Sequence, residues 1–196
     1  MKLTLVRHTS LNIESGICYG QSDVAVSHLF DQELASLKSK LAKYSFDAIY
    51  CSPLLRCQML AEALCLDSEL GLAQLSLKAD DRLKELHFGD WELSAWDSIP
   101  REVFDAWAND YANLAPPNGE TFNQLHLRAK SFLDEISSHS QGQHILVITH
   151  GGLIRALVAE VMQIPLKRLF RLVIDHASLT QLEFNGEIPK INFVNL

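Results

Sequence analysis

The chain has 196 residues, a formal net charge of −7 at pH 7 and an apolar fraction of 47%. This length and composition suit one domain that buries a hydrophobic core without disulfide or metal support, and they exclude global disorder. The acidic balance argues against a wide basic face, so we expect no nucleic-acid partner. An anionic ligand would therefore need a local cluster of cations.

Cysteine usage and hydropathy restrict the setting of the protein. The four cysteines show no CxxC spacing, so we expect reduced, buried thiols and a cytoplasmic location: Cys18, Cys51, Cys57 and Cys65. The most apolar stretch, 145–161, is interrupted by His150, Arg155 and Glu160, so we expect no membrane span. No feature of the sequence sets the oligomeric state.

In chain order, the pattern alternates between short buried strands and amphipathic helices. Gly16 to Asp23 is expected to be a loop, Ser52 and Pro53 to open the second helix, and Thr121 to cap the fourth. Asn185-Gly186 predicts a hairpin between the last two strands. Strands are expected at 2–6, 46–50, 75–78, 144–149, 179–184 and 190–194, and helices at 28–43, 53–66, 101–111, 122–136 and 151–161.

This alternation predicts a three-layer α/β/α sandwich with a mainly parallel sheet, and the closing hairpin adds an antiparallel edge. We expect a single domain over 1–196, with an insertion or lid at about 85–125. Trp91, Trp96 and Trp107 lie in or beside the insertion. Two interpretations stay open for them: a small aromatic core, or a wall against an aromatic leaving group.

Three of the predicted strands lead directly into cationic or imidazole side chains. The first ends at Arg7-His8, the second leads into Ser52-Pro53-Leu54-Leu55-Arg56, and a later one leads into His150-Gly151-Gly152. Ligands bind at the carboxyl ends of parallel strands, so we expect these side chains to converge. Two guanidiniums, two imidazoles and glycine amides at a helix N-terminus suit a phosphate dianion.

The segment Arg82-Leu83-Lys84-Glu85 adds a carboxyl group. A carboxyl group beside a bound phosphate is favoured in its protonated form, which suits a general acid. Each motif alone also has an ordinary explanation, such as a strand end, a capped helix, a tight turn or a solvated loop acid. The four motifs in this order are hard to obtain by chance, so the sequence predicts a phosphate-ester site.

These four motifs resemble the pattern of the histidine phosphatase superfamily, also called the phosphoglycerate mutase-like family. The resemblance implies a metal-independent phosphomonoesterase that acts on small-molecule phosphate esters and needs no cofactor. His8 would be the nucleophile that forms a phosphohistidine, and Glu85 would be the proton donor and acceptor. Arg7, Arg56 and His150 would hold the phosphoryl oxygens and stabilise developing charge.

Neighbouring positions complete the implied site and include one departure from the family pattern. Asn12, Gln21, Ser22 and Gly151 would be substrate-binding, although Asn12 can equally be a simple turn residue. The glycine that follows the family's nucleophile is Thr9 here, which would fit poorly if that position required a positive φ. We expect the Thr9 carbonyl still to accept a hydrogen bond from the nucleophile's ring N–H.

Three further blocks resemble the alpha-ribazole phosphatase branch of the family, which acts in cobalamin nucleotide-loop synthesis. The blocks are Cys18 to Asp23, Glu85 to Glu92 and Ala115 to Thr121. The expected substrate is therefore alpha-ribazole 5′-phosphate. A broad-specificity phosphatase, a phosphoglycerate mutase and a non-catalytic phospholigand-binding module remain as alternatives.

Overall fold

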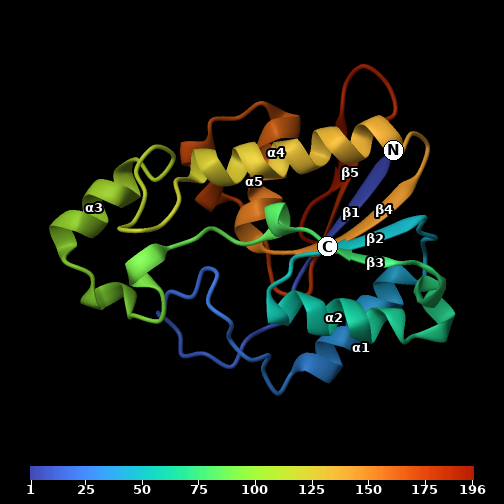
Figure 1. The fold of residues 1–196 in the computed structure, drawn as a ribbon, viewed down its shortest axis with the longest axis horizontal. Helices are drawn as coiled ribbons and strands as arrows, with labels where there is room; N and C mark the ends of the chain where they lie inside the picture. The colour runs from blue at the N-terminus through green and yellow to red at the C-terminus, as the bar shows by residue number, and fades with distance from the viewer.

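A computed structural model describes all residues 1–196 and shows one six-stranded sheet between two helical layers (Figure 1). The strand order is β3-β2-β4-β1-β5-β6. Strands β1 to β4 are parallel to one another, whereas β5 runs antiparallel to β1 and to β6. The predicted sandwich with a mainly parallel sheet and an antiparallel edge is confirmed. The strands are β1 Lys2–Arg7, β2 Ala48–Cys51, β3 Leu77–Ala79, β4 His144–Thr149, β5 Leu179–Glu183 and β6 Lys190–Phe193.

Alternating side chains of the central strands build two separate hydrophobic clusters. In β4, Ile145 and Val147 pack on the side of α4 and α5, whereas Leu146 and Ile148 pack on the side of α1 and α2. Successive residues of a strand face opposite sides of the sheet, so a continuous apolar run requires cover on both faces. No helix combines the length and apolarity needed to span a bilayer. The helices are α1 Phe30–Leu41, α2 Leu55–Cys65, α3 Arg101–Asn109, α4 Phe122–His139 and α5 Gly151–Met162.

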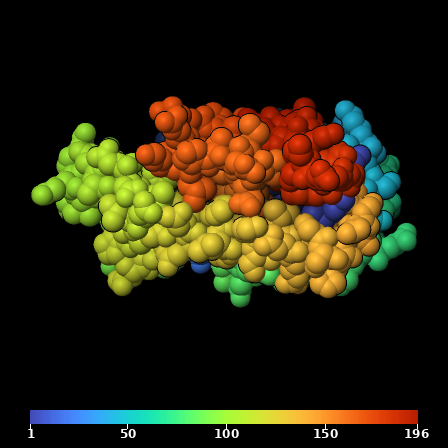
Figure 2. Space-filling model, turned by 90° about the horizontal axis from the view of Figure 1, so that it is seen from above, coloured from blue at the N-terminus to red at the C-terminus, as the bar shows by residue number.

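The chain between β3 and α4 contributes no strand to the sheet. It consists of α3 and short 3₁₀ turns, and its bridge between Ile17 and Ala95 joins it to the loop after β1. In two perpendicular views this segment projects at one end of the long axis, away from the N-terminus (Figures 1 and 2). It includes the residues at about 85–125 for which an insertion is expected, and that assignment stays a prediction. A lid function for it stays a prediction.

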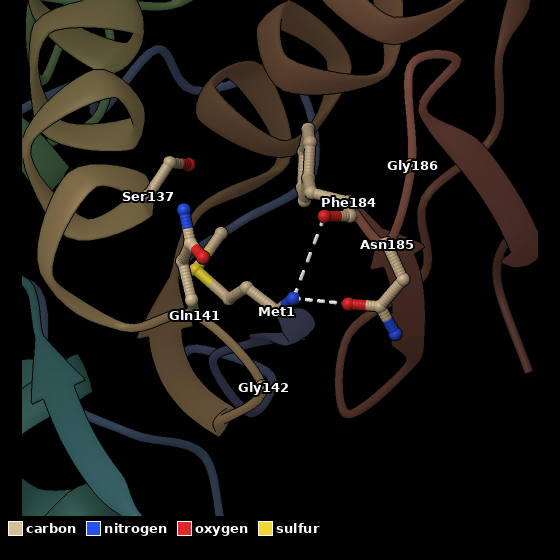
Figure 3. A pocket seen from close by; sticks show the side chains of 7 residues that line it. All are labelled: Met1, Ser137, Gln141, Gly142, Phe184, Asn185 and Gly186. Atoms are coloured by element: carbon tan, nitrogen blue, oxygen red, sulfur yellow. Dashed lines mark hydrogen bonds between the residues drawn. The ribbon is translucent and has the colours of Figure 1, made fainter.

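The amino end of the sheet carries a hollow of about 290 Å³ (Figure 3). The amino group of Met1 donates hydrogen bonds there to the Phe184 carbonyl, at 3.5 Å, and to the Asn185 side-chain oxygen. Apart from that amino group, no charged side chain lines the hollow. The histidines predicted for the site, His8 and His150, follow β1 and β4 at the opposite, carboxyl end of the sheet.

Two local predictions were wrong. Helix α2 begins at Leu55 rather than at Pro53, because Leu54 is extended and Ser52 does not cap the helix. Instead the Ser52 hydroxyl accepts a hydrogen bond from the Leu54 N–H at 3.3 Å and faces His150. All four cysteines are free thiols, but Cys65 is only partly buried.

The start of α4 agrees with its predicted cap and allows a stability test. The Thr121 hydroxyl accepts a hydrogen bond from the Gln124 N–H, and the Gln124 side chain accepts one from the Thr121 N–H. We expect Thr121→Ala to lower the free energy of unfolding by about 1 kcal/mol, because the cap is lost. Urea unfolding measures this, and Thr121→Ser, which keeps the hydroxyl, should stay near wild type. Equal losses in both variants would contradict the capping role.

Candidate active site

His8 directly follows β1, and its ring is 1% exposed. Its Nδ1 lies 2.7 Å from the carbonyl oxygen of Thr9. A carbonyl oxygen can only accept a hydrogen bond, so Nδ1 carries the ring proton and Nε2 keeps its lone pair. The free lone pair makes Nε2 the nucleophilic atom of the ring.

Thr9 accommodates this arrangement without backbone strain. It is not among the residues with positive φ, so its β-branched side chain meets no left-handed conformation. The predicted contact between its carbonyl and the His8 ring is present. The exchange of glycine for threonine therefore leaves the orientation of His8 intact.

The surroundings of His8 keep its imidazole neutral. Burial lowers the pKa of His8 well below the usual 6.5, and the positive charges of Arg56 and Arg7 lower it further. The Thr9 carbonyl acts in the opposite direction but is the smaller influence. At neutral pH the ring is thus unprotonated, as a nucleophile requires.

Arg56 points from the first turn of α2 into the loop after β1 and is fully buried. Its Nη1 donates to the Ser22 carbonyl at 2.9 Å, and its Nη2 donates to the Gly20 carbonyl at 2.6 Å. The guanidinium also lies 5.5 Å from the centre of the Tyr19 ring. Its Nε is buried without a hydrogen-bond partner.

Arg7, the last residue of β1, likewise has bonded Nη groups and an Nε without a partner. Its Nη1 donates to the Ile174 carbonyl at 2.5 Å, and its Nη2 donates to the Tyr19 hydroxyl at 3.2 Å and to His176 Nε2 at 2.9 Å. Its Nε is buried and unpartnered. The arginine ion pairs of the protein involve other residues, so no carboxylate neutralises either Arg7 or Arg56. Two unpartnered Nε donors beside a neutral imidazole suit a phosphoryl group.

His150 follows β4 and is completely buried. Its ring centre lies 5.1 Å from that of His8, and its Nε2 lies 2.8 Å from the Ser52 hydroxyl oxygen. Burial, followed by the charge of Arg56, lowers the pKa of His150 well below 6.5. The structure therefore brings together the side chains that the sequence placed at three separate strand ends.

Glu85 reaches the same region from the segment after β3. Its Oε2 accepts a hydrogen bond from the Gly152 N–H at 3.0 Å, and its Oε1 accepts one from the Leu86 N–H at 2.8 Å. A Cβ atom at position 152 would collide with this carboxylate, so glycine at this position lets the Glu85 side chain stay where it is. A Cβ atom at position 151 would lie 3.4 Å from Arg7 Nε, so the start of α5 lies close to this arginine.

The loop after β1 is fastened to the Glu85 segment. Gln21 donates from its side chain to the Glu85 carbonyl at 2.9 Å, and the N–H groups of Gln21 and Ser22 donate to the Glu92 carboxylate. Asn12 lies in the same loop, but its side chain is exposed, and its backbone N–H donates to the Ala25 carbonyl, away from His8. Its role in phosphate binding stays a prediction.

An apolar cavity of about 490 Å³ lies in the insertion. It shares Phe88 and Phe170 with a smaller cavity of about 50 Å³ that Glu85 and Gly152 also line. Trp107 Nε1 is buried without a hydrogen-bond partner. Trp91 packs 5.4 Å from Trp107 but does not line the cavity. The larger cavity is lined by Phe88, Trp96, Phe104, Trp107, Ala108, Tyr111 and Phe170.

No three His, Cys, Asp or Glu side chains come together in a group that could hold a metal ion. The charged groups at the carboxyl edge of the sheet are mainly cations, and the neutral histidines beside them are arranged for an anion. The donor set of this edge thus fits phosphate oxygens rather than a resident metal.

Comparison with known proteins agrees with this geometry. The model of the histidine phosphatase superfamily (branch 1) matches residues 3–196. The chain belongs to this superfamily. It is 28% identical over 200 residues to the adenosylcobalamin/alpha-ribazole phosphatase of Escherichia coli (strain K12), covering 100% of this chain and 96% of the relative.

One further sequence relative and one solved structure also match nearly the whole of this chain. Phosphoserine phosphatase 1 of Hydrogenobacter thermophilus is 25% identical over 199 residues, covering 98% of this chain and 92% of the relative. The crystal structure of the alpha-ribazole phosphatase from Shigella flexneri superposes with a TM-score of 0.88 at 26% identity, covering 100% of this chain and 96% of that one. The fold of this chain is thus the same as that of the Shigella flexneri enzyme along its whole length.

Sequence reasoning missed several residues that shape the site of this histidine phosphatase. His176 contacts Arg7 from the loop before β5, and Arg128 on α4 donates to the Glu85 carbonyl at 2.9 Å. Glu92 and Tyr19 belong to blocks that carry the resemblance, but the sequence assigned neither of them a role in the site. Arg155 could have been found, because it lies one helical turn after Gly151 on the same face of α5. His176 and Arg128 carry no local signal, since only the packing of distant segments brings them here.

The buried histidines predict how stability depends on pH. The folded-state pKa values of His8, His150 and His176 are lowered, that of His176 to about 4, from an ordinary value of 6.5. Below about pH 6.5 the unfolded chain binds more protons, so the free energy of unfolding should fall as the pH falls towards about 4. Each histidine lowers the free energy of unfolding by up to about 1.4 kcal/mol per pH unit in this range. Urea unfolding at a series of pH values tests this, and a flat profile between pH 6.5 and 5 would contradict it.

Proposed function

We propose that this protein is a metal-independent phosphomonoesterase that acts through a phosphohistidine at His8 and requires no cofactor. The observation that carries the proposal is the pair of buried, unpartnered Nε groups of Arg7 and Arg56 beside the unprotonated Nε2 of His8. A phosphoryl group bound to both guanidiniums would present its phosphorus to that lone pair.

In the first step, His8 Nε2 attacks phosphorus and the bond from phosphorus to the leaving oxygen breaks. Arg7, Arg56 and His150 stabilise the charge on the phosphoryl oxygens in the transition state. Glu85 gives its proton to the leaving oxygen, so that the product departs as a neutral alcohol.

In the second step, water attacks the phosphorus of the phosphohistidine and Glu85 takes a proton from it. The nitrogen–phosphorus bond breaks, its electron pair returns to His8 Nε2, and inorganic phosphate is released. Gln21, Ser22 and Gly151 would border the bound substrate, and Asn12 would be a further contact. The substrate is thus a small-molecule phosphate ester.

The proposed substrate is alpha-ribazole 5′-phosphate. Two observations support it: relatives named alpha-ribazole phosphatase match the whole chain, and an aromatic-lined cavity adjoins Glu85, where the leaving group would lie. A planar aromatic base would stack on the walls formed by Trp96 and Trp107. Cobalamin nucleotide-loop synthesis would place the enzyme in the cytoplasm, as the reduced cysteines also predict.

Phosphate release from a panel of esters, with a chelator present, tests the proposal. The panel contains alpha-ribazole 5′-phosphate, phosphoserine, 3-phosphoglycerate, sugar phosphates and a nitrophenyl ester. We expect the highest kcat/KM for alpha-ribazole 5′-phosphate, and a loss of about 10³-fold or more in His8→Ala, which cannot form the intermediate. Turnover by His8→Ala at the wild-type rate would refute the phosphohistidine.

The same panel separates the alternatives. Weak release from every ester would indicate a broad-specificity phosphatase. Transfer of the phosphoryl group between positions of phosphoglycerate, with little release, would indicate a mutase. Phosphate binding without turnover of any ester would indicate a non-catalytic phospholigand-binding module. Within the panel, Glu85→Gln should slow alkyl esters more than the nitrophenyl ester, because a good leaving group needs less protonation.

The unpartnered Trp107 Nε1 predicts a preference for leaving groups that carry an acceptor on the aromatic edge. The test compares how strongly 1-methylbenzimidazole and 1-methylindole inhibit nitrophenyl ester hydrolysis. We expect the ratio of their inhibition constants to favour 1-methylbenzimidazole about fivefold more in wild type than in Trp107→Phe, because the variant loses one hydrogen bond. The two probes have the same shape, but only the first has an acceptor nitrogen in its ring. Trp91→Phe, which alters a ring outside the cavity, should keep the wild-type ratio. An unchanged ratio in Trp107→Phe would exclude this role.

A further inference from the structure

The guanidinium of Arg7 is held by groups from the loop that precedes β5. Its Nη1 donates to the Ile174 carbonyl and its Nη2 donates to His176 Nε2, at 2.5 and 2.9 Å. The Tyr19 hydroxyl is a third, longer contact at 3.2 Å. The two shorter contacts both come from this loop, which therefore sets the direction in which the Arg7 Nε points.

The contact assigns the tautomer of His176. A guanidinium has donors and no acceptor, so His176 Nε2 must contribute its lone pair and the ring proton must lie on Nδ1. The imidazole must also be neutral, since a protonated ring would place an N–H against the Arg7 N–H. Protonation would therefore abolish the contact and set two positive charges against each other.

The charges around His176 favour this neutral form. Arg7 and Arg56 lower its pKa in addition to burial, whereas Asp175 raises it. His8 lies 5.3 Å away between ring centres and is itself neutral, and Tyr19 faces the same guanidinium. The balance lowers the pKa of His176 to about 4, so the ring accepts from Arg7 throughout the neutral range.

The backbone of the loop is fixed to the nucleophile's own strand. The Ala177 N–H donates to the His8 carbonyl at 3.2 Å, and the Arg7 N–H donates to the Ser178 carbonyl at 3.1 Å. Ala177 has a φ of +53°, a left-handed conformation that costs a non-glycine residue about 1 kcal/mol or more. This turn brings the preceding residue, His176, back over the end of β1, so surrounding contacts hold a strained backbone where it meets the site.

From these contacts we infer that His176 is a positioning residue for Arg7. It accepts from Arg7 Nη2 and so orients the guanidinium with its unpartnered Nε towards the phosphoryl group. The inference rests on the proposed function, because it assigns Arg7 to the phosphoryl oxygens. His176 acts through Arg7 and takes no part itself in bond making.

Two substitutions separate hydrogen bonding from mere packing. The side-chain oxygen of Gln reaches about as far as His Nε2, whereas that of Asn ends near the position of Nδ1 and cannot reach Arg7. We expect His176→Asn to weaken the binding of inorganic phosphate about tenfold or more, as loss of a hydrogen bond to a charged group predicts, and to lower kcat for the nitrophenyl ester by a similar factor. We expect His176→Gln to keep most of the wild-type phosphate affinity and most of the wild-type kcat.

The measurements are titration calorimetry with inorganic phosphate, steady-state kinetics with the nitrophenyl ester and thermal unfolding. His126→Gln is the matched control, because His126 bonds to Glu160 at 2.8 Å between α4 and α5, away from the site. It should leave phosphate affinity and kcat unchanged. The calorimetric arm needs no turnover, so it tests the role of His176 even if no ester is hydrolysed and the proposed function fails.

Two outcomes would overturn the inference. Wild-type phosphate affinity in His176→Asn would show that Arg7 needs no acceptor at this position. Equal losses in the Gln and Asn variants, at equal thermal stability, would show that only the imidazole shape matters. Weak binding in Asn with recovery in Gln supports the positioning role.

Discussion

Two guanidiniums without a carboxylate partner, that of Arg56 fully buried and that of Arg7 partly buried, determine the organisation of the carboxyl edge of the sheet. Arg7 and Arg56 lie at the carboxyl edge of the sheet, and neither forms an ion pair. A buried charge that is not compensated is costly, so such an arrangement persists only where the surrounding fold is stable and where an anion can complete it. The sheet, with two hydrophobic clusters on its faces, supplies that stability.

Main-chain carbonyls orient the arginines while leaving their charge available. Gly20, Ser22 and Ile174 contribute these carbonyls, so the guanidiniums are held by dipoles rather than by full negative charges. Glu85, the acid at this edge, is fastened to amide N–H groups instead of to the arginines. Burial, and after it the uncompensated cations, lower the pKa values of His8 and His150, so both rings are neutral. The cations proposed to bind the phosphoryl group thus also add to the effect that burial has on the pKa of His8.

Specificity has a different physical basis from phosphoryl transfer. Aromatic rings from the insertion, together with Phe170, line an open apolar cavity, and Trp107 Nε1 is buried without a hydrogen-bond partner. Stacking and shape would select the leaving group there, while the cationic edge treats every phosphoryl group alike. A chain with a net charge of −7 thus places two unpaired guanidiniums at the carboxyl edge of the sheet, beside an apolar cavity.

The sequence by itself determined the local elements, the layer order and the central chemical groups. Apolar patterns with the period of a strand or a helix involve only residues that are close in the sequence, so the sequence reveals them. Once the sheet is parallel, the strands that lead into Arg7-His8, Arg56 and His150 must bring these residues to the same edge. Helix α2 began two residues later than its Ser-Pro signal indicated, because Ser52 turns towards His150 instead of capping the helix. The tertiary structure alone decided the roles of His176 and Arg128, which contact groups about 170 and 40 positions away in the chain. Their contacts depend on side-chain directions after packing, and no local pattern of residues encodes those directions.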